Sequence, residues 1–313
     1  MQVDTKLLIT LLQWMRPAYS DTETDFCKTY LQPVFGEPDR HGNYIKVIGK
    51  RPPLAFTAHT DTVHKLDGVQ TLAIEDDFVT TMTGSCLGAD CTTGLWLMLG
   101  MIEAGIEGVY IAHAAEEIGG IGSTALVAYN PPWLDDIAAC ISFDRYGTES
   151  IITHQGGSRT ASDEFAASLA LALDMPFLKP DKGGTYTDSL EYAHIVPECT
   201  NISVGYYNQH SIGESQDLLY AEMLLERLIE ADWSLLVYVR DPSVPTTVAD
   251  HLSSLYTEDE EEVELCAIDD LIFNYPQRLA QVLLDYGFTA ESLAEEMGVE
   301  SEASLTYKEY YQS

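Results

Sequence analysis

An apolar segment of the chain, IAHAAEEIGG over 111–120, contains two adjacent acidic residues, Glu116 and Glu117, followed by isoleucine and two glycines. An apolar run without a helical charge pattern, closed by glycines, predicts a buried strand that ends in a loop. Open α/β sheets bind their ligands at the carboxyl ends of strands, where this pair would lie. Successive side chains there point in different directions, so one glutamate can hold a metal while the other faces a substrate. In isolation, an acidic pair in so acidic a chain is more typical of a solvated turn.

Four more side chains that can bind a metal follow predicted strands or turns: His59, Asp90, Asp144 and His210. The phrase HTD also places Asp61 two residues after His59, where it can orient the histidine ring. Each residue has an ordinary structural explanation too, because Asp61 can hydrogen-bond a buried histidine and Asp90 can cap the helix predicted beside it. Their shared position, mostly at the ends of predicted strands, favours one common site.

This set of side chains is suited to binding two divalent metal ions. Two histidines and three carboxylates can hold both ions, with one carboxylate bridging them, and the remaining acid is free to act as a general base. Three carboxylate charges offset most of the charge of two zinc ions, and the remainder favours ionisation of a bound water near neutral pH. The sequence contains no GxSxG phrase, no phosphate-binding loop and no GxGxxG after a predicted strand. The residues therefore predict hydrolysis by an activated water rather than by a serine or cysteine.

The elements that must position these residues alternate along the chain. Helical spacing of apolar residues predicts helices over 5–15, 21–31, 92–102, 123–129, 162–173 and 216–240. Apolar or alternating runs predict strands over 44–48, 54–58, 137–143, 150–153 and 201–205, besides the strand before Glu116 and a hairpin over 72–81. Strands that alternate with helices in this way predict an α/β domain.

The composition is that of a globular protein. The 313 residues are 46% hydrophobic, enough for one large α/β domain with an appendage. Sixteen basic and 50 acidic residues give a formal net charge of -34, which would repel nucleic acids and anionic membranes. No segment is long and apolar enough to span a bilayer, the amino terminus lacks a signal pattern, and the six cysteines show no CxxC spacing. We therefore expect a cytoplasmic protein with reduced cysteines and with no nucleic-acid or membrane partner.

Pro242 and Pro245 mark the predicted end of a catalytic domain that spans 1–245. The remainder, 246–313, contains an acidic block, TEDEEEVE, typical of a solvated linker, and then returns to helical periodicity. It has too few basic residues to read DNA. We expect an acidic linker and a small helical extension that packs or contacts a protein, whose identity the sequence does not give.

Five phrases occur in one order over about 50–240: HTD, LGADCTTG, EEIGG, SFD and NQHS. In this order and spacing they resemble the motifs of the co-catalytic zinc exopeptidases, a superfamily of aminopeptidases, carboxypeptidases and aminoacylases. The resemblance implies a three-layer α/β/α fold with a mixed, mostly parallel central sheet. It also implies two divalent ions per chain, zinc by preference with cobalt or manganese as alternatives, and a peptide or N-acyl amino acid as substrate.

The resemblance also assigns a role to each candidate residue. Asp90 would bridge the two ions, and the Asp90–Cys91 peptide bond would be cis. The other ligands would complete two sites, the first with His59 and Asp144 and the second with Glu117 and His210. Glu116 would be the general base, and Asp61 would orient a ligand histidine and the region of the base.

The chain departs from the family pattern in two ways. Cys91 stands where many relatives have a second acidic residue after the bridging aspartate, which keeps the ligands but changes their surroundings. Only 30 residues lie between His59 and Asp90 and only 65 between Asp144 and His210, too few for the inserted lid or dimerisation domain of many relatives. We therefore expect a compact domain whose open face admits the substrate. Candidates to line that face, although half-buried tyrosines often only pack, are Tyr146, Tyr186, Thr187, Asp188, Tyr206 and Tyr207.

The predicted activity is that of an aminopeptidase, in which a metal-activated water attacks the peptide carbonyl and Glu116 passes the water's proton to the leaving amine. In the family, aspartate at the position of Asp144 tends to accompany aminopeptidases. The alternative is a carboxypeptidase or an amidohydrolase of N-acyl amino acids or dipeptides, for which Arg145 and Arg159 are candidates to hold a free carboxylate. A binding protein on a retained peptidase fold is disfavoured, because all five ligands and the base are present.

Overall fold

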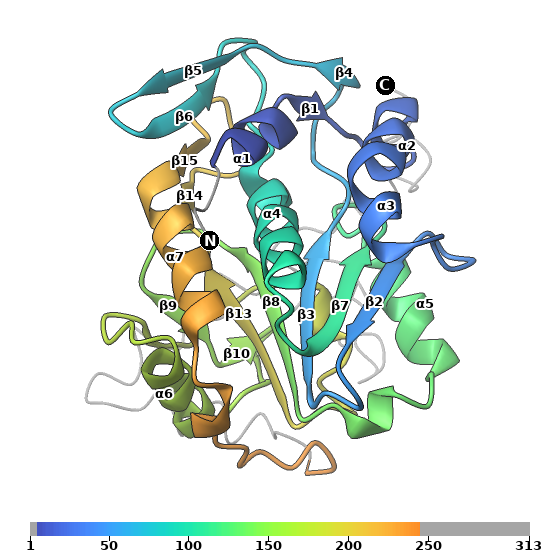
Figure 1. Ribbon diagram of the computed structural model, residues 1–313, viewed down its shortest axis with the longest axis vertical. Coiled ribbons are helices and arrows are strands. Elements are labelled where there is room, and N and C mark those ends of the chain that lie inside the picture. The colour runs from blue at the N-terminus through green and yellow to red at the C-terminus, as the bar shows by residue number, and fades with distance from the viewer. Residues whose placement is uncertain (1–4, 245–313) are drawn as a thin grey trace, which may run out of the picture. The chain divides into compact units, whose positions relative to one another are not determined.

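A seven-stranded sheet with the strand order β12-β9-β13-β8-β3-β7-β2 forms the centre of the computed structural model, which describes residues 5–244 (Figure 1). The strands are β2 (Tyr44–Ile48), β3 (Leu54–His59), β7 (Gly108–His113), β8 (Ala139–Arg145), β9 (Ser150–Ile152), β12 (Lys179–Asp181) and β13 (Glu198–Ser203). Strands β13, β8, β3 and β7 are parallel, as are β12 and β9, whereas β2 and β9 run antiparallel to β7 and β13. The predicted mixed, mostly parallel sheet is confirmed. The predicted extension over 246–313 lies outside the described residues.

The register of the parallel strands brings their carboxyl ends to one level. His59 at the end of β3 lies opposite His113 at the end of β7, and Thr57 lies opposite Ser142 in β8. The hydroxyl groups of Thr57 and Ser142 also share a buried hydrogen bond of 2.7 Å. Residues that follow these strands therefore meet at one edge of the sheet, where α/β folds place their ligand sites.

Four helices cover one face of the sheet: α1 (Thr5–Leu12), α4 (Ala89–Glu103), α6 (Asp163–Ala172) and α7 (Leu218–Glu230) (Figure 1). Their apolar sides join a core that includes Phe56, Tyr110 and Phe143 from three neighbouring strands. The rings of Phe56 and Phe143 are stacked, with 5.8 Å between their centroids. Removal of this apolar surface from water is the main force that holds the helices on the sheet.

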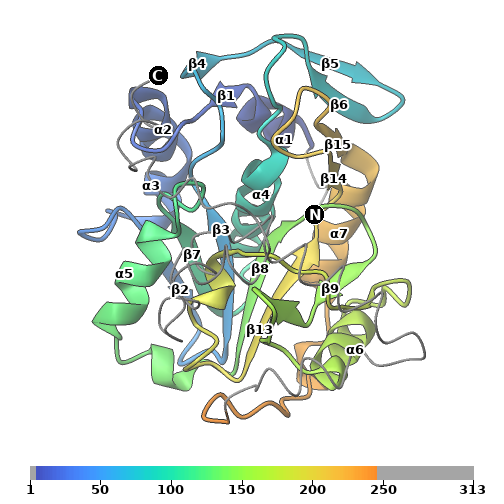
Figure 2. The same cartoon turned by 180° about the vertical axis from the view of Figure 1, so that it is seen from behind.

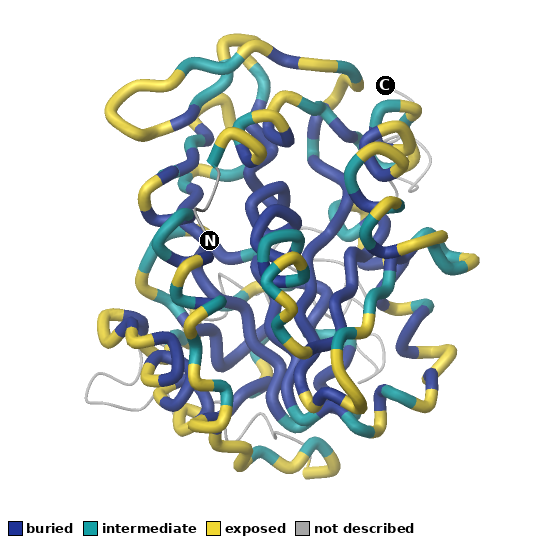
Figure 3. Tube along the Cα trace, viewed as in Figure 1, coloured by how far each residue is buried: buried dark blue, intermediate teal, exposed yellow. Residues whose placement is uncertain are grey.

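The opposite face packs against α5 (Ile121–Tyr129), which lies beside β2 and β7 at the left of Figure 2, and against the segment that contains Tyr192. Helix α5 contributes to a second core whose members include Ala55, Val109, Ile111, Leu126 and Tyr192. Along β3, Leu54 and Phe56 belong to the first core and Ala55 to the second, because successive side chains of a strand point to opposite faces. The central strands β3, β7, β8 and β13 and most of α4 are buried, whereas the edge strands β2 and β12 are mostly not (Figure 3). The three-layer α/β/α prediction is confirmed.

A smaller antiparallel sheet has the order β14-β15-β6-β5. Its strands are β5 (Leu72–Glu75), β6 (Phe78–Thr81), β14 (Tyr206–Tyr207) and β15 (Ser215–Asp217). Strands β5 and β6 form the predicted hairpin, in which Asp76 and Asp77 have positive φ angles of 48° and 67° that match a tight hairpin turn. Strands β14 and β15 flank the loop that carries His210, so this sheet fixes the position of that loop.

The remaining elements are short. Two-residue strands pair β1 (Trp14–Met15) with β4 (Gly68–Val69) and β10 (His154–Gln155) with β11 (Ser158–Arg159). Helical turns are α2 (Asp21–Phe26), a π-helical turn (Cys27–Leu31), α3 (Gln32–Phe35) and 3-10 turns at Leu134–Asp136, Asp188–Leu190 and Trp233–Leu235. The Ser20 side chain caps α2 by accepting a hydrogen bond from the Glu23 amide. Within residues 5–244, the helices are all too short or too polar to cross a membrane.

Two helices are shorter than the sequence predicts. The last was expected over 216–240, but α7 ends at Glu230. Asp232 accepts a hydrogen bond from the amide two residues later, a local bond that competes with the helix, and Trp233 packs edge-on against Phe56 at 5.3 Å. The first helix, expected over 5–15, ends at Leu12 because the next residues pair with β4. In both places tertiary contacts override the helical periodicity.

Candidate metal centre

Five metal-capable side chains that are distant in the sequence meet at the carboxyl edge of the central sheet. They come from the end of β3, the start of α4, the loop after β7, strand β8 and the loop after β14: His59, Asp90, Glu117, Asp144 and His210. Within the described residues, possible ligand atoms of Asp90, Glu117 and His210 all lie within 4.8 Å of one another. The same is true of His59, Glu116 and Glu117. The structure therefore brings together the residues that the sequence selects as ligands.

The carboxylate of Asp90 lies between the two histidines. Its Oδ1 atom is 3.0 Å from Nε2 of His59, and its Oδ2 atom is 3.1 Å from Nε2 of His210. The same nitrogen of His59 lies 3.4 Å from Oδ1 of Asp144, and that of His210 lies 3.2 Å from Oε1 of Glu117. The five donors thus form two groups that share Asp90, an arrangement suited to two metal ions bridged by one carboxylate.

The backbone before α4 is shaped to present Asp90. Gly88 has a positive φ of 74°, and a Cβ atom there would lie 2.8 Å from the His64 ring, so no other residue fits without a shift. The Asp90–Cys91 peptide bond is cis, as the family resemblance implies.

Glu214 holds the same segment from the other side. Its buried carboxylate accepts hydrogen bonds of 2.8 to 3.2 Å from four successive backbone N–H groups, those of residues 87 to 90. Sequence reasoning missed this residue. Its position four residues after His210 is the only local signal, because its partners lie more than 120 positions earlier in the chain.

Asp61 fixes both the histidine ring and the loop of the acidic pair. Its carbonyl oxygen accepts a hydrogen bond of 3.0 Å from Nδ1 of His59, which turns Nε2 of the ring toward Asp90. The two carboxylate oxygens of Asp61 accept the backbone N–H groups of Glu116 and Glu117, each at 3.1 Å. The orienting role predicted for Asp61 therefore has a physical basis in these contacts.

Asp144 is held through its main chain. Asn201 accepts a hydrogen bond from the Asp144 amide at 2.9 Å and donates one to its carbonyl oxygen at 2.8 Å. The hydroxyl group of Tyr206 donates to the same carbonyl at 3.0 Å. These contacts leave the carboxylate free to face the site. Asn201 was not foreseen, because a single asparagine within a strand carries no sequence signal.

The buried carboxylates of the site would be stabilised by bound cations. Oε1 of Glu117 and Oδ1 of Asp144 are buried without a hydrogen-bond partner. Burial, followed by repulsion from Asp90, raises the pKa of Asp144 to about 8, and burial also raises the pKa of Glu117 and of Glu116. Buried carboxylates without partners are costly unless a positive charge joins them. This donor set of two imidazoles and three carboxylates fits two divalent ions such as zinc.

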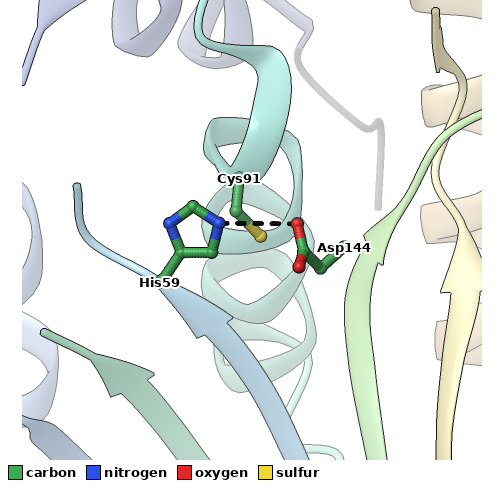
Figure 4. Close-up of side chains that lie close together, drawn as sticks. All are labelled: His59, Cys91 and Asp144. Carbon is green, nitrogen blue, oxygen red and sulfur yellow. Dashed lines mark ion pairs between the residues drawn. The ribbon is translucent and has the colours of Figure 1, made fainter. Parts of the chain in front are cut away.

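Cys91 lies beside the ligands without sharing their role. Its sulfur is near His59 and Asp144, as Figure 4 shows, and it comes from the start of α4. The thiol donates a hydrogen bond of 3.0 Å to the carbonyl oxygen of Phe143, and burial raises its pKa well above the ordinary value. Both observations favour a neutral thiol that anchors α4 to β8.

The side chains predicted to bind substrate lie in different places. A cavity of about 100 Å³ contains the metal centre and is also lined by Tyr146, Tyr186 and Tyr206, together with Arg145. Tyr207 and Tyr146 line a separate open groove, and Thr187 and Asp188 are buried outside the cavity lining. Arg159 forms an ion pair of 3.0 Å with Asp163 and is also not part of that lining. The structure thus brings only part of this set to the cavity.

Known proteins resemble this chain in structure but not in sequence. No protein-family model matches the chain, and no curated protein resembles it in sequence. Its structure is similar to the aminopeptidase PepT from Bacillus cereus ATCC 10987, with a TM-score of 0.57 at 15% identity, covering 74% of this chain and 99% of the other. A tripeptidase from Staphylococcus aureus subsp. aureus Mu50 gives a TM-score of 0.58 at 14% identity, covering 74% of this chain and 98% of the other.

A third similar structure is the TET1 peptidase of Pyrococcus horikoshii, which can assemble into a tetrahedron or a large octahedral shell. It gives a TM-score of 0.57 at 14% identity, covering 72% of this chain and 98% of the other. At identities this low, the structural similarity establishes a shared fold and nothing more. The predicted three-layer α/β/α fold is therefore confirmed.

Proposed function

We propose that the chain is a metal-dependent aminopeptidase that binds two divalent ions, zinc by preference. One observation carries the proposal: the two oxygens of Asp90 face two different histidines, and each of the resulting groups includes a buried carboxylate oxygen that accepts no hydrogen bond. Solvated acids in a turn would have neither the burial nor the two histidines. The fold shared with an aminopeptidase and a tripeptidase supports the same activity.

The proposed ligands divide into two groups around Asp90. The first is completed by His59 and Asp144, and the second by Glu117 and His210. When bound, the two ions would act as Lewis acids that lower the pKa of a water and polarise the substrate carbonyl. Asp61, Asn201 and Glu214 hold the ligands in place through the hydrogen bonds described above, so the site is preorganised before any ion binds.

Glu116 is the proposed general base. Its Oε2 atom lies 3.9 Å from Nε2 of His59, and its backbone N–H is held by Asp61. It therefore faces the site without being needed as a ligand. In the proposed reaction Glu116 takes a proton from the attacking water and delivers it to the amine that leaves.

We also place the enzyme in the cytoplasm. The five cysteines within the described residues, Cys27, Cys86, Cys91, Cys140 and Cys199, are buried free thiols, as is usual in a reducing compartment.

A hydrolysis screen with added zinc, cobalt or manganese tests the proposal. Peptides with a free amino terminus should be cleaved, their N-acetylated forms should be poor substrates, and a chelator should abolish activity that added metal restores. Preference for the N-acetylated forms would instead indicate an amidohydrolase on the same site. Absence of hydrolysis from metal-loaded protein, or binding of fewer than two ions by the active form, would overturn the proposal.

A further inference from the structure

Two buried polar side chains that are not metal ligands line the cavity of the proposed active site. Arg145 is 9% exposed and Gln155 is 1% exposed. Each has one buried polar atom without a hydrogen-bond partner, Nε of Arg145 and Oε1 of Gln155. Buried donors and acceptors in proteins are nearly always paired, so an unpaired donor and an unpaired acceptor on two residues that line one cavity point to a ligand that supplies the missing partners.

Arg145 is only partly neutralised by the protein. Its Nη2 atom lies 3.3 Å from a carboxylate oxygen of Asp181 and 3.2 Å from the hydroxyl of Tyr146, whose ring stacks against the guanidinium at 4.1 Å. The same oxygen of Asp181 also accepts a hydrogen bond of 2.6 Å from Ser150. Asp181 is therefore shared. The unpaired Nε leaves Arg145 able to bind a second carboxylate, the group that its planar guanidinium recognises best.

Gln155 has a fixed orientation. Its Nε2 atom donates to the hydroxyl groups of Thr160 and Ser189 and to the carbonyl oxygen of Cys199, at 3.1 to 3.3 Å. A carbonyl oxygen can only accept, so the amide nitrogen must point toward these groups. Oε1 is thereby fixed as an acceptor for an N–H group, such as that of a peptide bond.

The wall beside these residues is rigid. Gln155 pairs with Gly184, and Gly156 donates a hydrogen bond of 2.6 Å to the carbonyl oxygen of Thr185. A Cβ atom on Gly184 would lie 2.3 Å from the carbonyl oxygen of His154, so the loop is pressed against β10. The wall borders the same cavity of about 100 Å³ that contains the metal centre, so a peptide held both at the metal centre and at Arg145 is short.

We propose that Arg145 and Gln155 form a subsite for the carboxyl end of a short peptide, so that the preferred substrates are dipeptides and tripeptides with a free C-terminal carboxylate. The inference rests on the proposed function, which puts the amino-terminal peptide bond at the metal centre of the same cavity. The carboxylate pairs with the Arg145 guanidinium, and in a tripeptide the second peptide N–H, which is not cleaved, donates to Oε1 of Gln155. Within the described lining of the cavity, Arg145 is the only arginine or lysine, and a carboxylate among so many acidic groups needs such a cation.

Wild-type enzyme tests the subsite without any substitution. Ala-Ala and Ala-Ala-Ala would be compared with their C-terminal amides and with hexa-alanine, all with a free amino terminus. A charged hydrogen bond of this kind contributes about 1.5–3 kcal/mol, so amidation should lower kcat/KM by roughly 10- to 100-fold. Equal kcat/KM for acids and amides, or a preference for hexa-alanine, would overturn the subsite and leave the aminopeptidase proposal intact. Failure to cleave any of these peptides would overturn the aminopeptidase proposal itself.

Three arginine variants locate the effect. In Arg145→Met the ratio of kcat/KM for acid and amide should fall close to one, mainly through a higher KM for the acids. Arg227→Met is the matched control, because Arg227 also pairs with one aspartate, at 2.9 Å, but lies on the surface, and it should keep the wild-type ratio. Loss of the ratio in Arg159→Met rather than in Arg145→Met would show that the subsite is assigned to the wrong arginine.

N-acetyl-alanine carries the same carboxylate without a free amine. Cleavage of N-acetyl-alanine in preference to Ala-Ala, with sensitivity to Arg145→Met, would support the subsite while overturning the aminopeptidase assignment. If Arg145→Met does not fold, the comparison of acids and amides on wild-type enzyme still decides.

Discussion

Two clusters of buried charge have opposite character. In the first, which we call the Arg16 cluster, Arg16 is fully buried together with Glu23 and Thr60. Arg16 donates 2.8 Å hydrogen bonds to the carbonyl oxygen of Thr60 and to the hydroxyl of Thr92, and its guanidinium lies 4.0 Å over the Phe26 ring. Glu23 accepts hydrogen bonds from Thr60 and from the Tyr19 amide.

The metal centre contains more acidic groups and fewer partners. Oxygens of Glu117 and Asp144 are buried without a hydrogen bond. The Arg16 cluster instead contains a basic and an acidic side chain, and the buried polar atoms of both have hydrogen-bond partners. The difference teaches that burial of charge alone does not identify a site. A cluster with complete partners stabilises the fold, and a cluster with unpaired atoms of one sign reserves space for a ligand of the opposite sign.

The largest expected effect separates Glu116 from Glu117. Glu116→Gln keeps the size of the side chain and removes the base, so turnover should fall by about 10² to 10⁴ fold while two ions remain bound. Glu117→Gln alters a proposed ligand, so metal binding should weaken and excess metal should partly restore activity. Turnover and metal content by atomic absorption check both variants. Full activity in Glu116→Gln together with normal metal content in Glu117→Gln would refute the assignment of this loop.

The next effect contrasts the two clusters directly. Arg16→Met should lower the free energy of unfolding by about 1–3 kcal/mol, because it leaves the buried carbonyl oxygen of Thr60 and hydroxyl of Thr92 without the hydrogen bonds that Arg16 donates. Asp144→Asn should instead raise the stability of the metal-free protein by about 1 kcal/mol, since it removes one of several mutually repelling carboxylates. Urea denaturation in the presence of a chelator measures both. If both variants lose a similar free energy of unfolding, the two clusters do not differ in their contribution to stability.

Glu214→Gln tests whether a carboxylate that is fully hydrogen-bonded within the protein also contributes to metal binding. An amide has one acceptor oxygen in place of two for the four N–H groups before α4, so Asp90 should be held less firmly and metal affinity should fall by about 10- to 100-fold. Glu198→Gln is a matched control: Glu198 is also buried and accepts backbone N–H groups, those of Ser162, Val239 and Arg240. It should lower stability with little change in metal affinity, measured by competition with a chromogenic chelator. Equal losses of metal affinity in both variants would assign Glu214 a general structural role only.

The last expected effect concerns a buried neutral group, the ring of His64, and develops only as the pH falls below about 6.5. Burial lowers the pKa of His64 to about 4, and its ring contacts the hydroxyl of Thr62 and the carbonyl oxygen of Cys86. Folding therefore disfavours the protonated ring, and the stability that neutral His64 provides above its unfolded pKa of about 6.5 is lost as the pH falls toward 4. The loss is about 1.4 kcal/mol per pH unit within this window.

His64→Gln removes this titration. The unfolding free energy of wild type minus that of the variant should therefore decrease between pH 6.5 and pH 4, as followed by urea denaturation at several pH values. A difference that stays constant across this window would show that His64 is not held neutral in the fold.

The sequence by itself determined the positions of the proposed ligands and the type of fold. Apolar runs that end in His59, in the Glu116 loop and in Asp144 specify strands, and parallel strands necessarily bring their carboxyl ends to one edge. The hairpin at Asp76 and Asp77 follows from local turn chemistry in the same way. These features depend on residues close in the chain, so their periodicity and order are sufficient.

Only the tertiary structure decided which side chains support those ligands and which face the cavity. The hydrogen bonds of Glu214, Asn201 and Asp61 join segments more than 50 residues apart, and no local pattern encodes such pairs. The sequence offered Arg145 and Arg159 as candidates to hold a carboxylate and favoured Arg159, but only Arg145 lines the cavity. A side chain's partners depend on how strands and loops pack against one another, and that packing minimises the free energy of the whole domain rather than of any one segment.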